Sequence, residues 1–131
     1  MPTLKVAGLE KPVAIQSIVW IKGDGNYARL HYANSQFYLA AQTLNWFKNQ
    51  LSGFIRIHKS VLVNPTHIIQ FEQIKTKEAR VLMSTGPSLD IARRRIVEVR
   101  TKLGMPPFEA HSFLLIDPNW RQDKDQISKP Y

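Results

Sequence analysis

The sequence contains no cysteine, no long hydrophobic run and few acidic residues. Without cysteine the chain can form neither a disulfide bond nor a thiolate metal site, which is compatible with the reducing cytoplasm. No stretch approaches the roughly 18 consecutive apolar residues that indicate a membrane-spanning helix, and residues 1–6 lack the apolar core of a secretory signal. We therefore expect a soluble cytoplasmic protein that makes no membrane contact.

The sequence also lacks a recognisable catalytic or metal-binding pattern. Its histidines, His31, His58, His67 and His111, show no close spacing of the kind found in helical zinc sites. His58 stands two residues before Ser60, but a nucleophilic serine needs a positioned base and usually an orienting acid, which this spacing does not guarantee. We expect no enzyme activity, no metal and no cofactor.

The shortage of acids leaves the chain strongly basic. Its 18 lysines and arginines outnumber its 10 acids, which gives a formal net charge of +8 at pH 7. Residues 1–53 carry a net charge of +3, residues 54–102 carry +6 and residues 103–131 carry −1. Such a field attracts polyanions, among which nucleic acids and anionic membrane surfaces are the leading candidates. Any nucleic-acid surface is therefore expected within the first 102 residues.

Most of the chain is predicted to form strands. With 131 residues, of which 44% are hydrophobic, it is long enough for one domain with an apolar core. Short segments rich in β-branched and aromatic residues alternate with turn-forming residues, as is typical of strands. Strands are predicted at 18–21, 27–32, 37–40, 54–57, 61–63, 68–71, 79–83 and 89–91. Lys22–Asn26 is predicted as a loop, and the charged segment Lys75–Glu78 as a break between strands.

Two segments have apolar residues at helical spacing. They are Leu44, Phe47 and Leu51, and then Ile96, Val99 and Leu103. Thr43 is a suitable N-cap for the first helix, which is expected to end near Gly53. The second helix is expected from about residue 94 and is stopped by Gly104. The expected fold class is therefore mostly β with short α-helices.

Two polar segments lie between predicted strands. In the first, Gly25 gives the backbone freedom and Asn26 offers a donor and an acceptor, which suits contact with a base edge or a phosphate. A plain hairpin turn favours the same residue types. In the second segment, Lys59 is flanked by His58 and Ser60. Here the alternative is a buried hydrogen-bonding histidine beside a solvated lysine at a strand end.

A third polar segment, Arg93-Arg94-Arg95, lies where the last predicted strand passes into the second helix. Positive side chains near a helix N-terminus oppose the helix dipole, at a cost of about 0.3–1 kcal/mol. A bound phosphate would offset that cost, and arginine can also donate two hydrogen bonds to guanine O6 and N7. A solvated basic face is the alternative interpretation.

The order of these segments resembles the LytTR family of bacterial DNA-binding domains. The matching pieces are Gly23-Asp24-Gly25-Asn26-Tyr27, the leucine-rich helix, the block Phe54–Asn64 and the close Ala92-Arg93-Arg94-Arg95. The resemblance runs over about residues 10–104 and implies an elongated, multi-sheet LytTR-like β fold that places loops in neighbouring major grooves of duplex DNA. It divides the chain into a lead-in at 1–10, a DNA-binding domain at 11–104 and an extension at 105–131.

The resemblance also implies which residues contact DNA. Base-edge contacts are implied for Asn26, Lys59 and Arg93. Contacts with the DNA backbone are implied for Tyr27, Arg56, His58, Ser60, Arg94 and Arg95.

Some positions in the matching blocks have other expected roles. Arg56 and His58 can brace the loop instead of contacting phosphate, and Val63 and Asn64 are expected to be structural. The family commonly has serine before the arginine pair, where this sequence has Ala92. A hydroxyl that would contact phosphate or cap the last helix is therefore missing.

The resemblance implies a transcriptional regulator that binds double-stranded DNA at repeated half-sites, as a homodimer. Family members often follow a phosphorylatable receiver domain, but only about ten residues precede the match, so we expect a stand-alone regulator or a domain taken from a larger protein. The extension 105–131 leans acidic and is expected to be partly flexible or to contact a regulatory protein. The rival hypothesis is a non-enzymatic protein-interaction module that modulates another regulator, with Phe113 and Trp120 in its docking patch.

Overall fold

The computed structural model describes residues 2–109 and 116–117 of the chain. Antiparallel strands are its main secondary structure, so the predicted mostly β fold class is confirmed. The strands are β1 (Thr3–Leu4), β2 (Val13–Ala14), β3 (Ile18–Asp24), β4 (Tyr27–Tyr32), β5 (Phe37–Ala40), β6 (Ile55–His58), β7 (Val61–Val63), β8 (Ile68–Lys75), β9 (Glu78–Met83), β10 (Ser88–Ile91) and β11 (Ile116–Asp117). The helices are α1 (Leu44–Gln50) and α2 (Ile96–Lys102), with 3-10 turns η1 (Ile15–Ser17), η2 (Pro65–His67) and η3 (Arg93–Arg95).

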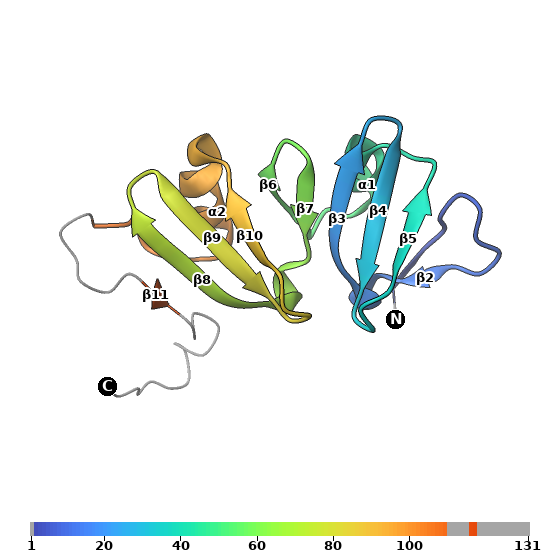
Figure 1. Ribbon diagram of the computed structural model, residues 1–131, viewed down its shortest axis with the longest axis horizontal. Helices are drawn as coiled ribbons and strands as arrows, with labels where there is room; N and C mark the ends of the chain where they lie inside the picture. Colours follow the sequence, from blue (N-terminus) through green and yellow to red (C-terminus); the bar gives the residue numbers. More distant parts are fainter. Residues whose placement is uncertain (1, 110–115, 118–131) are drawn as a thin grey trace.

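Two main sheets lie side by side along the long axis of the molecule (Figure 1). The five-stranded sheet has the strand order β5-β4-β3-β7-β6, and the four-stranded sheet has the order β10-β9-β8-β11. β1 and β2 form a small sheet of their own. The two main sheets meet where β10 contacts β6. This arrangement gives the elongated, multi-sheet fold that the family resemblance implied.

Strand pairing shortens the first predicted loop. β3 continues through Asp24, which pairs with Tyr27 of β4, so that only Gly25 and Asn26 remain in the turn. The prediction that the loop starts at Lys22 was therefore wrong. Pairing with β4 satisfies the backbone of these residues in spite of their weak strand propensity.

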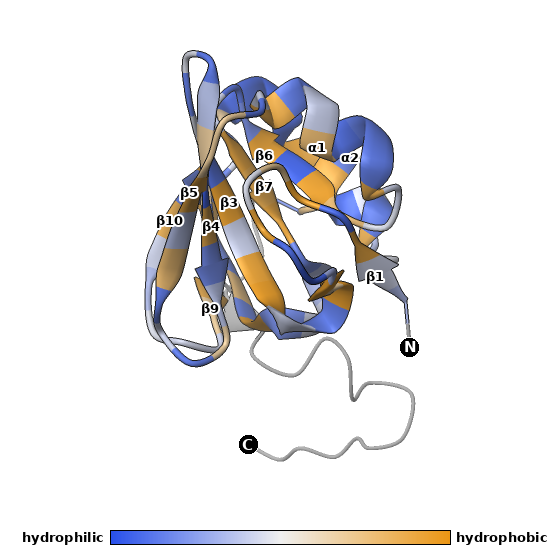
Figure 2. Cartoon of the chain, turned by 90° about the vertical axis from the view of Figure 1, so that its right-hand side faces the viewer, coloured by the Kyte–Doolittle hydropathy of each residue, from blue (hydrophilic) through white to orange (hydrophobic). Residues whose placement is uncertain are grey.

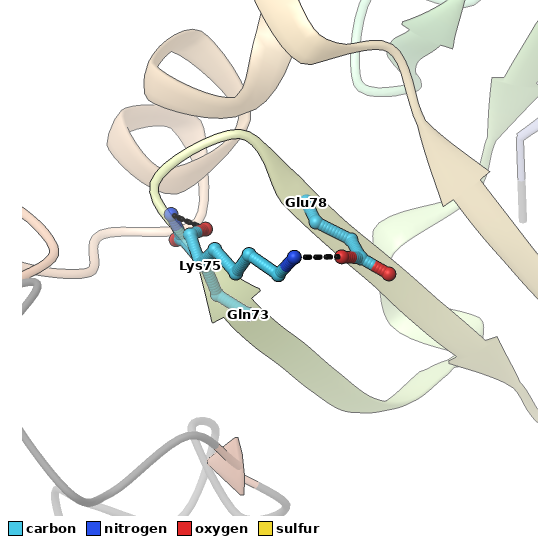
Figure 3. Close-up of polar contacts among 3 residues, drawn as sticks. All are labelled: Gln73, Lys75 and Glu78. Carbon is cyan, nitrogen blue, oxygen red and sulfur yellow. Dashed lines mark hydrogen bonds and ion pairs between the residues drawn. The ribbon is translucent and has the colours of Figure 1, made fainter.

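The charged segment between β8 and β9 is likewise a tight turn. Lys75 ends β8 and Glu78 begins β9, so that two residues separate the strands. Lys75 Nζ lies 3.8 Å from a Glu78 carboxylate oxygen, and Gln73 Nε2 donates to the Lys75 carbonyl at 3.0 Å. Figure 3 shows both contacts at the turn. Both charged side chains are exposed, so the buried Gln73 amide does more to fix the turn than the ion pair.

Both predicted helices are present, and they lie on the same side of the sheets (Figure 2). Thr43 caps α1 as predicted, because its hydroxyl oxygen accepts from the Trp46 backbone N–H at 3.1 Å. α2 is followed by Gly104, whose φ of 74° ends the helix in the left-handed region. The apolar faces of the two helices cover two different cores.

Two hydrophobic cores form, and β7 contributes to both. The first, under α1, includes Ile21, Leu30, Phe47 and Leu62. The second, under α2, includes Ile57, Val61, Val63, Phe71, Val81 and Val99. Because successive side chains of a strand point to opposite faces, Leu62 packs in the first core while its two neighbours pack in the second. β7 is accordingly buried along its whole length.

Part of the C-terminal extension packs against the domain. Met105 contacts the second core, and β11 pairs antiparallel with β8. Phe113 and Trp120, which carry the protein-docking hypothesis, lie outside the described residues. Within 2–109 and 116–117, no helix is long and apolar enough to cross a membrane.

Asn64 is one of the few buried polar residues, with 3% of its surface exposed. Its Nδ2 donates to the Ile18 carbonyl at 2.9 Å, and its Oδ1 accepts from the backbone N–H and the hydroxyl of Thr66. The side chain therefore joins the end of β7 to β3 and caps η2. These contacts give Asn64 the structural role expected from the sequence.

Replacing Asn64 by alanine leaves the buried Ile18 carbonyl without its side-chain donor and removes the η2 cap. We expect Asn64→Ala to lower the free energy of unfolding by about 1–3 kcal/mol, measured by urea denaturation. Asn49→Ala is the matched control, because Asn49 is exposed on α1 and should change stability by less than about 0.5 kcal/mol. Equal losses in the two variants would contradict a specific role for the buried amide.

Candidate nucleic-acid interface

Three polar segments of the sequence come together at one end of the fold. β3 pairs with β7, which places the Gly25-Asn26 turn and the Lys59-Ser60 turn at the same end of the five-stranded sheet. The Gly23 backbone N–H also donates to the Ser60 carbonyl at 2.8 Å. The first two predicted contact loops are therefore neighbours held by backbone bonds.

The third segment joins them through the edge strand β6. The Ala92 backbone N–H donates to the Ile57 carbonyl at 2.7 Å, and η3 contacts β6. In Figure 1 the β3–β4 turn, the β6–β7 turn and the end of β10 all point toward the top of the view. We call the turns Gly25-Asn26 and Lys59-Ser60, together with Arg93–Arg95, the three-loop end.

The first loop exposes its amide at a tight tip. Gly25 has a φ of 62°, a conformation that favours glycine at this turn position. No heavy atom beyond its neighbours in the chain lies within 4 Å of where a Gly25 Cβ would stand, so the tip protrudes from the body of the fold. Asn26 is exposed, and Tyr27 has 49% of its surface exposed. Both side chains are accessible to a partner.

The second loop is braced from within. Arg56 Nε donates to the His58 carbonyl at 3.0 Å, and the same guanidinium donates to the Lys59 carbonyl. His58 Nδ1 accepts from the Ser60 backbone N–H at 3.2 Å and lies 3.0 Å from the Ser60 hydroxyl oxygen. The ring hydrogen of a neutral His58 is therefore on Nε2. These bonds favour the bracing role of Arg56 and His58, while the Lys59 side chain is exposed.

The third loop presents arginines in two environments. Arg93 and Arg94 are exposed, whereas Arg95 is half-buried. Ala92 makes no side-chain cap at the start of η3, as its lack of a hydroxyl requires. The backbone bond from Ala92 to Ile57 fixes the position of the segment instead. The loop is therefore anchored even though the serine is missing.

The charge around the three-loop end is predominantly positive. Among the described residues, no ion pair involves Lys59, Arg56 or Arg93–Arg95. Partial burial, followed by the charge of Arg95, lowers the pKa of Arg56. Further along the hairpin, burial and then Arg29 and Lys22 lower the pKa of His31 below its usual value. An anion would meet a largely uncompensated positive field here.

Other chemistries find little support in the described part of the chain. No three histidine or carboxylate side chains gather there as possible metal ligands. Ser60 and His58 do contact each other, but the Nδ1 atom involved also accepts the Ser60 backbone N–H, so it cannot act freely as a base. The arrangement favours binding through exposed amide and cationic side chains.

Sequence reasoning missed the role of Gly23. A Cβ at this position would stand 2.9 Å from Leu44 Cβ, closer than real contacts allow. The absence of a side chain therefore lets β3 pass close to α1 while its backbone reaches Ser60. A glycine inside a strand often marks such a close approach, which was the available signal.

The fold and the three-loop end define a β domain with a basic surface built from turns. The model of the LytTr DNA-binding domain family matches residues 10–104. This chain therefore belongs to the LytTR family of DNA-binding domains. The family consists of DNA-binding domains and is not a family of enzymes.

Individual relatives agree with this assignment. The transcriptional regulatory protein LytR of Staphylococcus aureus strains N315 and USA300 is 25% identical over 92 residues, which cover 69% of this chain and 37% of LytR. The match thus spans little more than a third of the length of these relatives. Among solved structures, the LytTr domain of a protein named as a methyl-accepting/DNA response regulator from Bacillus cereus has the same fold. It superposes with a TM-score of 0.67 at 21% identity, over 79% of this chain and 96% of that chain.

Adding a methyl group at Gly23 forces β3 and α1 apart. We expect Gly23→Ala to lower the free energy of unfolding by about 1–3 kcal/mol, from overpacking against Leu44. Gly53→Ala is the control, since a Cβ there meets nothing within 4 Å and should leave stability unchanged or raise it by up to about 1 kcal/mol. Urea denaturation of both variants measures the difference. An unchanged free energy of unfolding in Gly23→Ala would refute the close-approach argument.

Proposed function

We propose that this domain binds specific sequences of duplex DNA by inserting its three loops into the major groove and thereby regulates transcription. The observation that carries the proposal is the pair of backbone bonds, Gly23 to Ser60 and Ala92 to Ile57, which hold three exposed polar segments at one end. Segments fixed in this way can contact one DNA duplex together. Membership of a DNA-binding family supports the choice of DNA over other polyanions.

Base edges are assigned to one exposed polar side chain in each loop. Asn26 can pair its amide with adenine, while Lys59 and Arg93 can donate to guanine O6 and N7. Each protrudes from a turn, and backbone hydrogen bonds to another part of the fold hold that turn in place. This separation lets the side chains read bases without supporting the core.

The DNA backbone is assigned to the neighbours of these residues. Tyr27 and Arg94 are exposed, and Ser60 and Arg95 are half-buried beside them. Hydroxyl and guanidinium groups donate well to phosphate oxygens. Arg56 and His58 complete the set of six, with the His58 Nε2–H as a possible donor in addition to the bracing bonds of both residues.

Further features of the proposal follow from the LytTR family and concern the assembled regulator. We propose binding to repeated half-sites, with two copies of the chain on the DNA, in the cytoplasm. Contact with a regulatory protein is assigned to residues 105–131, and a response-regulator-like organisation to the full protein. Because the match spans 37% of the LytR relatives, these assignments to the full regulator are proposals.

The proposal is tested by selecting bound duplexes from a random-sequence pool. The selected duplex and a scrambled control are then titrated at two salt concentrations. We expect a recurrent motif that binds more tightly than the control, with affinity falling as salt rises because bound cations release counterions from DNA. Weak, salt-sensitive binding with no enriched motif would reject sequence recognition and favour the protein-interaction module.

Variants of the third loop separate base contact from phosphate contact. Arg93→Ala should lose about 1–3 kcal/mol of binding free energy on the selected duplex and relax preference at one base pair. Arg94→Ala should weaken selected and scrambled duplexes by the same factor. Lys11→Ala is the charge-matched control, because Lys11 is exposed in the segment that joins β1 and β2. Equal losses on both duplexes for Arg93→Ala would refute its base-reading role.

A further inference from the structure

Arg95 has a buried donor with no acceptor. Among the residues that the structure describes, its Nε is the only buried side-chain nitrogen or oxygen without a hydrogen-bond partner. Buried polar atoms are nearly always paired, so an exception needs a physical explanation. Arg95 occupies the last position of η3, next to the edge strand β6.

The strand that η3 contacts carries a charge of the same sign. Arg56 lies on β6, which contacts η3, and partial burial followed by the charge of Arg95 lowers the pKa of its guanidinium. Neither arginine has a carboxylate partner among the described residues. The free protein thus holds two cations together with one donor unused, which is an unfavourable arrangement unless an anion joins it.

We propose that Arg56 and Arg95 form a single phosphate site between the second and third loops, and that the phosphate bound there couples base reading by Lys59 to base reading by Arg93. The inference rests on the proposed DNA-binding function and specifies where one phosphate of the DNA backbone binds within that interface. Its ligand is one phosphodiester of the bound duplex.

A phosphate at this position satisfies both local deficits. Its oxygens accept from the Arg95 guanidinium, whose Nε–H has no partner in the free protein, and its negative charge screens the two guanidinium groups from each other. Hydrogen bonds between charged groups are stronger than neutral ones, and partial burial keeps water from weakening them. Arg94 can also make charged hydrogen bonds, but it is exposed and lacks the protection from water that partial burial gives.

The coupling follows from what each arginine already holds. Arg56 donates to the carbonyls of His58 and Lys59, so fixing its guanidinium fixes the backbone that presents the Lys59 side chain. The Arg95 backbone N–H donates to the Ala92 carbonyl at 2.8 Å across the turn that contains Arg93. One phosphate held by both arginines therefore sets the distance between two base-reading side chains.

The first test replaces single phosphates of the selected duplex by uncharged methylphosphonates. We expect one position at which wild-type protein loses about 10- to 100-fold in affinity, while Arg95→Met, already weakened, loses little more. Arg94→Met is the control and should still lose affinity at that position, because its side chain serves another phosphate. Additive losses for Arg95→Met at every position would overturn the site.

The second test measures coupling directly. Lys59→Ala and Arg93→Ala are combined in a double-mutant cycle, in the wild-type background and again in Arg95→Met. We expect non-additive losses in the wild-type background and additive losses once Arg95 is replaced. Additivity in both backgrounds would refute the coupling. If no duplex is selected at all, the proposed function fails, whereas selection with additive cycles rejects only the phosphate site.

The third test uses the DNA-free protein. Because Arg95→Met removes the unpaired buried donor and one of two like charges, its Tm should rise by a few degrees while its DNA affinity falls. Arg94→Met should leave the Tm of the free protein unchanged. A lower Tm for Arg95→Met would assign Arg95 a structural role and overturn the proposal.

Discussion

The pairing of β7 with β3 on one side and β6 on the other is the constraint on which the rest of the structure depends. This three-residue strand is buried on both faces and lends side chains to both hydrophobic cores. It also sets the position of the Lys59-Ser60 turn relative to the β3–β4 hairpin. Burial of the whole strand contributes hydrophobic free energy to folding, and this contribution involves both cores. The two cores and the loop geometry are therefore stabilised together.

Local features of the fold could be predicted because local interactions decide them. Thr43 caps α1 through a bond three residues away, and Gly104 ends α2 by its own conformation. The positions of β5 and β7 follow from apolar residues that lie between turn signals. In each case the physical cause lies within a few residues of the observed element.

Other features depend on contacts that no local pattern encodes. β3 extends through Gly23 and Asp24 because β4 pairs with them, against their own propensity. β1 and β2 have two residues each, too few for any periodic signal. The contact between β6, which carries Arg56, and η3, which carries Arg95, joins positions far apart in the chain. The sequence could therefore nominate the basic residues of the site, but not which of them brace the loops and which face outward.

The protruding tips have a consequence for how such domains diverge. No atom beyond the adjacent chain lies near the Gly25 Cβ direction, and the side chains of Asn26, Lys59 and Arg93 lie outside both cores. Substitutions at these three positions therefore cost little folding free energy. If these side chains read bases as proposed, selection can exchange them one at a time, so that duplicated copies of the gene acquire new operators while the scaffold stays the same.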